Sequence, residues 1–334
     1  MGGKTKRLGR GMWSGRRRSA KTGRLSSALG AASPSLSLTK TLLLRKELLD
    51  AFVVYIDANS LTALCKAMAK VESTRAILLD RELWRHLLQT HCHVDLAHFN
   101  VHRSVILRGG SFVLSDYLSL RSQLERFNRC VQVVEGDLGT VTAVGGQLVE
   151  CLVFPTSYTY RNPHRGVAGR IHERAGPDLD QAVANIGTRY SAAAGSVKCT
   201  VGCGSGMRLL VHCVGPVADH PDSDEVLYKT YVSALLAADS NHVTCAAVAS
   251  ISTGLLRFPV PRAAGIALSA VRDLIRLRPH WSMNVAFICI DQAVYEHFLR
   301  ARRETVQVFH TAQFAFPHLV KTLSMTEPRD GHAA

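Results

Sequence analysis

A glycine-containing segment in the second half of the chain has the residue types that bind a phosphate group. The segment RGVAGRIHERAG, residues 165–176, has glycines near its start and a helical pattern that begins near Val167. Glycine lets the backbone come close to a bound anion, and the first turn of a helix offers N–H groups without partners at the positive end of its dipole. The predicted anion-binding residues at this turn are Gly166, Val167, Ala168 and Gly169.

Two other segments place polar or small residues directly after apolar runs. EGDLGT, residues 135–140, follows VQVV and contains Asp137, and SISTGLLRFPVPRAA, residues 250–264, follows another apolar run. An aspartate in such a turn commonly accepts a hydrogen bond from its own backbone. Ser252 is not predicted to be a nucleophile, because the GxSxG elbow is absent and no partner base is indicated.

Five apolar runs of strand length surround these segments, and helical stretches separate most of them. The runs are residues 131–134, 148–154, 207–214, 243–251 and 284–290. The helical stretches are residues 179–194, 225–238, 262–277 and 293–303. Apolar strands that alternate with helices form a largely parallel sheet covered on two sides. The predicted fold is a three-layer α/β/α domain, whose ligands collect at the loops beyond the carboxyl ends of the strands.

Residues 131–303 resemble a macro domain, the α/β module that binds ADP-ribose. The resemblance rests on four phrases in the correct order: EGDLGT, RGVAGRIHERAG, LVHCVGP and SISTGLLRFPVPRAA. It implies a mixed, largely parallel sheet, and it implies that Asp137 accepts a hydrogen bond from the adenine amino group. The second and fourth phrases would wrap the two phosphates and the distal ribose, and Ile290 stands where an aromatic residue usually stacks on adenine. The ADP-ribose-binding residues implied in this way are Asp137, Leu138, Gly166, Val167, Ala168, Gly169, Ser252, Thr253, Gly254, Leu255, Leu256 and Ile290.

The positions that carry catalysis in hydrolytic macro domains hold other residues here. Those members have an asparagine after the second strand, which holds the distal ribose and the attacking water. That position is Ser157 or Tyr158, depending on the alignment, and the acidic residue of some hydrolases is Ala168. Side-chain substitutions leave the backbone N–H groups available to bind phosphate, and Arg165 and Arg257 add positive charge that favours a diphosphate. The resemblance therefore implies a reader of ADP-ribose or ADP-ribosylated protein without catalytic residues. An ADP-ribosyl hydrolase with rearranged residues, acting on proteins or on O-acetyl-ADP-ribose, is the alternative.

Residues 42–90 have apolar residues at helical spacing and predict three short helices, with Asp57 at the break before the second. The order LLRKELLDAFVVYIDANSLTALCKAMAKV…LLDRELWRHLL is similar to an F-box, the helical module that docks on the adaptor of a cullin ubiquitin ligase. This resemblance implies partner docking through Leu48, Leu61, Leu83 and Trp84. A helical bundle that only packs on its neighbour is the alternative.

Residues 91–130 are predicted to connect this region to the α/β domain and to end in an amphipathic helix at residues 116–127. The connector opens with residue types that bind zinc: His91, Cys92, His93, His98 and His102. Their spacing fits no common structural zinc site, which needs four converging ligands, so no metal is predicted. Residues 304–334 form a C-terminal extension with aromatic residues that can pack on the domain or bind a partner.

Most of the net charge of +14 belongs to the N-terminal tail. Residues 1–46 contain 12 Lys or Arg and no acidic residue, so the rest of the chain carries only +2. Residues 1–41 have few large apolar side chains and are predicted to be disordered. Residues 1–46 would serve nuclear import or a weak nucleic-acid contact, with a nuclear or cytoplasmic location, and a mitochondrial transit peptide remains open.

Other function classes are not indicated. No window approaches the ~20 uninterrupted apolar residues that cross a bilayer, so no membrane partner is predicted. GCGSG, residues 202–206, precedes a strand and is followed by Met207 where the dinucleotide-binding fingerprint needs glycine, so no cofactor is predicted. The nine cysteines include no CxxC pair, and they are typical of small buried apolar residues in a reducing compartment.

Overall fold

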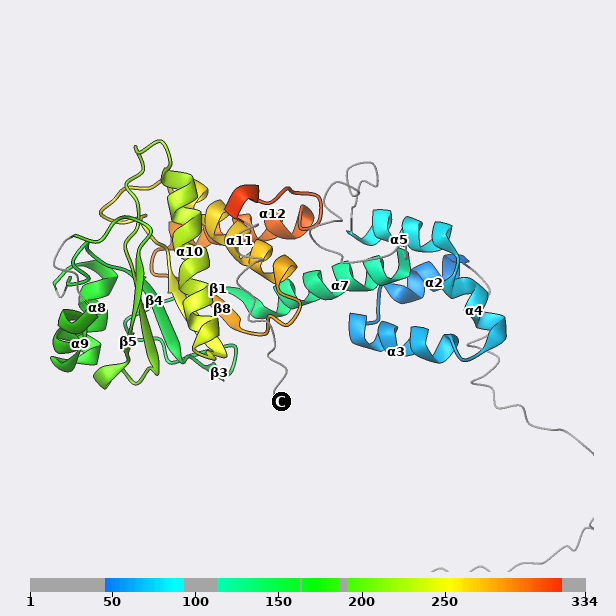
Figure 1. Cartoon of the computed structure of the whole chain (residues 1–334), viewed down its shortest axis with the longest axis horizontal. Coiled ribbons are helices and arrows are strands. Elements are labelled where there is room, and N and C mark those ends of the chain that lie inside the picture. The colour runs from blue at the N-terminus through cyan, green and yellow to red at the C-terminus, as the bar shows by residue number, and fades with distance from the viewer. Residues whose placement is uncertain (1–45, 93–112, 163, 187–190, 320–334) are drawn as a thin grey trace, which may run out of the picture. The chain divides into compact units, whose positions relative to one another are not determined.

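The computed structural model describes residues 46–92, 113–162, 164–186 and 191–319. The predicted basic tail at residues 1–41 lies outside these ranges, as do His93, His98 and His102. The described chain consists of helices up to Cys130, followed by alternating strands and helices from Val131 onward (Figure 1).

A six-stranded sheet, in the order β1-β8-β7-β4-β6-β5, forms the middle of the α/β domain. Its strands are β1 (Val131–Glu135), β4 (Cys151–Pro155), β5 (Val197–Val201), β6 (Leu209–Cys213), β7 (Cys245–Ala249) and β8 (Asn284–Cys289). Neighbouring strands are parallel except for β5, which pairs antiparallel with β6. A small hairpin of β2 (Ala143–Val144) and β3 (Gln147–Leu148) precedes β4. The predicted mixed, largely parallel sheet is confirmed.

The edge strand β5 is absent from the predicted strands for a physical reason. Lys198 in its middle is exposed, and Thr200 is buried with its hydroxyl 2.9 Å from Nε2 of His212. An edge strand with one face in water has polar residues where a central parallel strand has an apolar run. The apolar runs in the sequence therefore indicate the other five strands of the sheet and miss this one.

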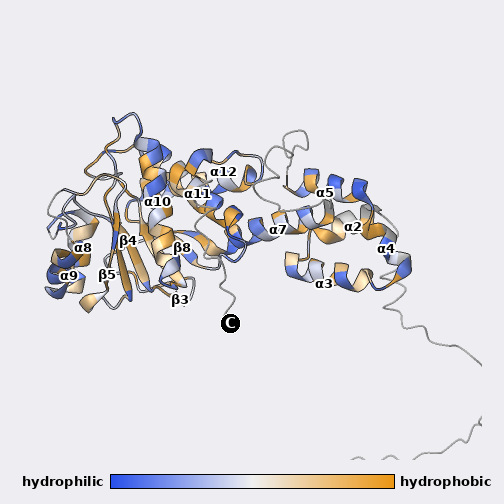
Figure 2. Ribbon diagram, in the orientation of Figure 1, coloured by the Kyte–Doolittle hydropathy of each residue, from blue (hydrophilic) through white to orange (hydrophobic). Residues whose placement is uncertain are grey.

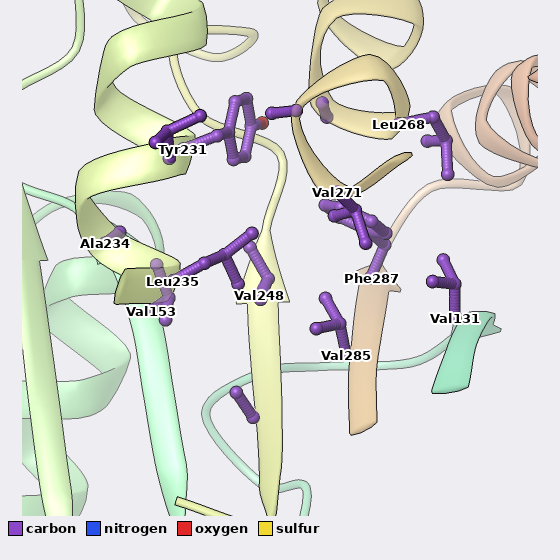
Figure 3. Packing of buried hydrophobic residues seen from close by; sticks show 14 of the residues in the cluster. Val131, Val153, Tyr231, Ala234, Leu235, Val248, Leu268, Val271, Val285 and Phe287 are labelled. Carbon is purple, nitrogen blue, oxygen red and sulfur yellow. The ribbon is translucent and has the colours of Figure 1, made fainter. Parts of the chain in front are cut away.

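Helices cover both faces of the sheet, which confirms the three-layer arrangement. They are α8 (Gly166–Ala175), α9 (Asp178–Ile186), α10 (Ser223–Ser240), α11 (Val260–Leu277) and α12 (Gln292–Gln307). Alternate residues of β4 enter different cores, since Val153 packs with residues of α10 and α11 whereas Phe154 packs with residues of α8 and α9. Figure 3 shows the first core, where Val153 and Val248 face Leu235. The inner strands are largely hydrophobic, whereas the helices have two faces (Figure 2).

The α/β domain continues past the predicted boundary at residue 303. Helix α12 runs to Gln307, and Phe309 is buried in the same core as the sheet residues. Phe314 lies under the buried guanidinium of Arg276, 4.4 Å from its central carbon to the ring centre. The predicted boundary is wrong because the apolar positions of α12 continue beyond it and carry the chain back onto α11. Residues 304–319 are part of the domain.

Within the described ranges, five helices precede the sheet: α2 (Lys46–Val53), α3 (Ala58–Met68), α4 (Glu72–Leu78), α5 (Arg81–Cys92) and α7 (Val113–Cys130). The described part of residues 42–90 thus contains one helix more than predicted, because α4 is separate from α5. Asp57 caps α3 as predicted, and its Oδ1 accepts hydrogen bonds from the N–H groups of Asn59 at 2.9 Å and Ser60 at 3.0 Å. Helix α7 extends beyond the predicted helix at residues 116–127 at both ends.

Helix α7 satisfies backbone groups at the ends of two other helices. The Arg121 guanidinium donates to the carbonyl oxygens of Val53 and Ile56 at the end of α2. The Glu125 carboxylate accepts from the N–H of Ala58, the first residue of α3, at 2.8 Å. Helix ends leave such groups without intrahelical partners. These two side chains therefore fix α2 and α3 against α7.

Three of the four predicted docking residues are core residues of the helical region. Leu61, Leu83 and Trp84 are 1%, 4% and 2% exposed. The ring of Trp84 lies 5.7 Å from that of Tyr117 on α7. The prediction that these three contact a partner directly is wrong, because helical spacing aligns them on the face that packs inward. Leu48 is 39% exposed and remains on the surface.

The remaining sequence motifs have structural explanations. His91 Nδ1 lies 2.8 Å from the Tyr117 hydroxyl. No three His, Cys, Asp or Glu residues within the described ranges gather where they could hold a metal ion. Residues 202–206 contain the short turn η1 (Cys203–Ser205), and β6 follows it as predicted. Among the helices of the described ranges, none is long and apolar enough to span a membrane.

Candidate functional site

A cavity of about 670 Å³ opens at the carboxyl ends of β1, β4, β7 and β8. Its volume lies within the range of about 300–1,000 Å³ that small-molecule sites occupy. Parallel strands end at the same edge of a sheet, so the loops that follow them meet there. All predicted ADP-ribose-binding residues except Gly169 line this cavity: Asp137, Leu138, Gly166, Val167, Ala168, Ser252, Thr253, Gly254, Leu255, Leu256 and Ile290.

The first turn of α8 presents backbone N–H groups to the cavity. Gly166 has a φ of +57°, a left-handed conformation that favours glycine, and it begins the helix after Arg165. The N–H groups of Gly166, Val167 and Ala168 have no acceptor among the residues that the structure describes. The N–H of Gly169 donates to the Arg165 carbonyl oxygen at 3.1 Å. The prediction for Gly169 is therefore wrong, because its N–H closes the first helical hydrogen bond and is not free for a ligand.

The loop after β7 presents a second group of N–H donors. The Phe258 N–H donates to the Ser252 carbonyl oxygen at 3.0 Å, which closes the loop. Within the described chain, the N–H groups of Thr253, Gly254 and Leu255 have no hydrogen-bond acceptor, and these residues line the cavity. Two groups of unpaired N–H donors therefore border the same space.

Arg257 in this loop has a φ of +51°. The left-handed conformation costs a residue with a Cβ about 1–2 kcal/mol. A glycine would adopt this conformation without that cost. Arg257 does not line the cavity, so it does not contribute the direct charge to a diphosphate that the sequence suggests.

Gly215, after β6, lies in close contact with the loop after β7. A Cβ at this position would lie 2.2 Å from Ser252 Oγ and 2.9 Å from Ile251 Cγ2, so only glycine fits. Ser252 is 4% exposed, and its Oγ has no hydrogen-bond partner among the described residues. A buried hydroxyl without a partner costs about 1–3 kcal/mol. A ligand group that reached this oxygen would recover that cost.

Asp137 is held by two hydrogen bonds at the β1 side of the cavity. Its Oδ1 accepts from the Gly139 N–H at 2.7 Å, which is the local turn expected of an aspartate in this sequence. Its Oδ2 accepts from Nη2 of Arg170 on α8 at 2.8 Å. A carboxylate offers about four acceptor positions, so both oxygens keep capacity for a ligand donor.

Comparison with known proteins identifies the family. The family model of the macro domain matches residues 157–267. A macro domain-containing protein of Cupriavidus necator is 34% identical over 133 residues, which are 39% of this chain and 76% of that protein. The O-acetyl-ADP-ribose deacetylase of Escherichia fergusonii is 33% identical over 131 residues, which are 38% of this chain and 73% of that protein. This chain belongs to the macro domain family. The Oceanobacillus iheyensis macrodomain with ADP is a similar structure at 24% identity and a TM-score of 0.48, and the similarity covers 53% of this chain and 92% of that one.

The loop after β4 of this macro domain holds both residues that could occupy the family's asparagine position. Ser157 and Tyr158 line the cavity. The Ser157 hydroxyl donates to the Arg161 carbonyl oxygen at 2.7 Å and lies 3.1 Å from Thr159 Oγ1. Tyr158 is 48% exposed. The hydroxyl proton of Ser157 is thus donated to the backbone.

Among the described residues, carboxylates line this macro domain's cavity and histidines do not. No described histidine lines the cavity, and the carboxylates that do are those of Asp137 and Asp291. His172 of α8 is buried and does not line the cavity, and its Nδ1 lies 3.4 Å from Oδ1 of Asp180. Burial lowers the pKa of His172, and the neighbouring Asp180 carboxylate opposes that shift. Because His172 does not line the cavity, it is not placed to contact a ligand there.

Several lining residues are absent from the sequence predictions. They are Gly136, Pro155, Thr156, Asn162, Arg170, Val214, Gly215, Ala249, Ser250, Ile288, Cys289, Asp291 and Val294. Most lie at or just after the end of a predicted apolar run, so the ends of these runs give a usable signal for them. Arg170 has no such signal, because its position at the cavity depends on the tertiary contact between α8 and the loop after β1.

Proposed function

We propose that this macro domain binds ADP-ribose, free or attached to a protein, without hydrolysing it. The proposal rests on two sets of unpaired backbone N–H groups that border one cavity. They belong to residues 166–168 and residues 253–255. Unpaired N–H groups at a helix start and in a compact loop suit the negative oxygens of a diphosphate. The relative from Escherichia fergusonii, named for a compound of ADP-ribose, supports the same ligand.

The rest of the ligand would extend in both directions from the diphosphate. Adenine would lie at the β1 side, with its amino group donating to Asp137 and its ring against Ile290, which is 67% exposed. The distal ribose would lie toward the loop after β4, near Ser157 and Tyr158. An aliphatic side chain gives adenine less stacking than an aromatic one, so we expect affinity on the order of micromolar.

Isothermal titration of the full chain with ADP-ribose tests this proposal. Asp137→Ala should weaken binding about tenfold or more, because a hydrogen bond to a charged group contributes about 1.5–3 kcal/mol. Asp219→Ala, at an exposed position outside the cavity, should leave binding unchanged. Absence of heat with ADP-ribose at concentrations far above micromolar would contradict the proposal.

The absence of hydrolysis is the finer part of the proposal, and an ADP-ribosyl hydrolase is the competing function. Non-catalytic binding is supported by the Ser157 hydroxyl, whose proton is donated to a backbone carbonyl oxygen, and by the lack of a described histidine at the cavity. General base catalysis needs a group within hydrogen-bond reach of the attacking water. Incubation with mono-ADP-ribosylated protein and with O-acetyl-ADP-ribose should leave both intact. Release of ADP-ribose above the rate without protein would favour the hydrolase.

Recruitment to a ubiquitin ligase adaptor is proposed as a second role, for the helical region. Four apolar residues within and directly after α2 are exposed: Leu48, Phe52, Val54 and Tyr55. Exposed apolar groups of this kind are common at protein interaction sites. Co-purification with the adaptor should be lost in Tyr55→Glu and kept in Val71→Glu, which changes another exposed apolar residue of the same region.

Nucleic-acid contact and nuclear or cytoplasmic location stay predictions from the tail sequence alone. The 12 basic residues among residues 1–46 support a phosphate contact. Deletion of these residues should abolish binding to duplex DNA, and binding by the intact chain should fall steeply with salt.

A further inference from the structure

Two arginines of α8 reach from the helix to the loop after β1. Arg170 Nη2 donates to Oδ2 of Asp137 at 2.8 Å. Arg174 Nη1 donates to the Val141 carbonyl oxygen at 2.8 Å and lies 3.4 Å from that of Gly139. Residues four positions apart lie on the same face of a helix. The helix that supplies N–H groups to the cavity is therefore fastened to the loop that supplies Asp137.

The contact around Asp137 is close enough to fix its carboxylate. A Cβ at Gly139 would lie 2.8 Å from the Cβ of Arg170, so the loop passes close to the base of the Arg170 side chain. The Gly139 N–H and the Arg170 guanidinium each hold one carboxylate oxygen. The Asp137 side chain is only 21% exposed. An ionised donor and a fixed turn together leave this carboxylate one orientation.

We propose that Arg170 is a positioning residue that sets base selection at this site. By holding Asp137 it presents a fixed acceptor to the exocyclic amino group of adenine. A base with a carbonyl oxygen at that place would be repelled by the Asp137 carboxylate, because the carboxylate is held in place and cannot rotate. This inference rests on the proposed function, because it assumes that the base of ADP-ribose lies at Asp137.

The test compares ADP-ribose with inosine diphosphate ribose, in which a carbonyl replaces the amino group. The wild-type chain should bind ADP-ribose about 10- to 100-fold more tightly, because the analogue leaves a charged acceptor without its donor. Arg170→Ala frees Asp137 and should lower ADP-ribose affinity about tenfold with little effect on the analogue. The preference should therefore shrink to a few-fold.

Arg174→Ala is the matched control, since it removes a contact between the same helix and the same loop but leaves Asp137 held. It should keep the wild-type preference even if both ligands bind more weakly. A purely structural role for Arg170 would lower both affinities and keep their ratio, and that result would overturn the inference.

A second variant and the wild-type affinities separate the remaining outcomes. If thermal unfolding shows that Arg170→Ala is not folded, Arg170→Gln replaces it as the test variant. This substitution keeps the packing of the side-chain stem but removes the charge. It should also reduce the ratio of the affinities for ADP-ribose and inosine diphosphate ribose. If the wild-type chain binds ADP-ribose without preferring it over the analogue, this inference fails and the proposed function stands. If wild type binds neither ligand, the proposed function fails, and the inference fails with it.

Discussion

Asp273→Ala is expected to lower the free energy of unfolding by about 3–5 kcal/mol, because it leaves buried positive charge without its counter-ion. Asp273 is fully buried on α11, and its Oδ1 accepts from Nε of Arg272 at 2.8 Å. Its Oδ2 accepts from the Tyr228 hydroxyl at 3.0 Å and from the Ala315 N–H at 3.1 Å. Burial lowers the pKa of the nearby Arg276 to about 10, so that guanidinium stays charged at neutral pH.

The same carboxylate joins the C-terminal segment to α10 and α11. Arg272 Nη2 and Arg276 Nη1 also donate to the carbonyl oxygens of Gln313 at 2.9 Å and Ala312 at 3.0 Å. Loss of Asp273 should therefore expose residues 309–319 to protease before the rest of the domain. This outcome would support the placement of those residues within the domain.

Urea unfolding of the full chain measures the effect of Asp273→Ala. Tyr228→Phe serves as the milder variant, because it removes one hydrogen bond to the carboxylate and should cost about 1.5–3 kcal/mol. Asp239→Ala is the control, since Asp239 makes a partly exposed pair with Arg278 at 3.4 Å and should cost less than about 1 kcal/mol. Equal losses in Asp273→Ala and Asp239→Ala would contradict the buried network.

The free energy of unfolding is expected to fall by about 2 kcal/mol between pH 6 and pH 5, through two buried histidines. Burial lowers the pKa of His212 to about 3, and nearby His172 adds to the shift. Burial also lowers the pKa of His310 to about 3, with Arg276 adding to it. An unfolded histidine takes up a proton near pH 6.5, whereas these two stay neutral in the fold. Their contribution is therefore fully present above pH 6.5 and is lost as pH falls toward 3.

Unfolding at closely spaced pH values separates the two histidines. His212→Gln keeps a polar partner for the Thr200 hydroxyl and should halve the slope, and His310→Phe should do the same. The double variant should show a nearly flat profile between pH 6 and pH 5. An unchanged slope in the double variant would show that other groups cause the acid sensitivity.

The inner part of the fold can be predicted from the sequence because its physical causes are local. The apolar run NVAFICI, for example, predicts β8, and the turn residues that follow such runs predict the loops of the cavity. The segment around Gly166 predicts the anion-binding turn at the start of α8, because both the glycine and the start of the helix can be recognised in the sequence. β5 escapes prediction because its half-exposed pattern resembles a loop.

The remaining features depend on the exact start of a helix or on tertiary contacts between distant segments. Gly169 has the right residue type, but it is one position too deep in the helix for its N–H to be free. Arg170 reaches Asp137 from a segment 33 residues away, so its place at the cavity needs the packed structure. Trp84 fits a docking motif in sequence, but packing against Tyr117 buries it.

A crystal structure of the full chain with ADP-ribose is the most direct test of the central claim. The account predicts diphosphate oxygens within hydrogen-bond distance of the N–H groups at residues 166–168 and 253–255, with the adenine amino group at Asp137. Diphosphate held only by arginine side chains, or ligand bound away from this cavity, would contradict it.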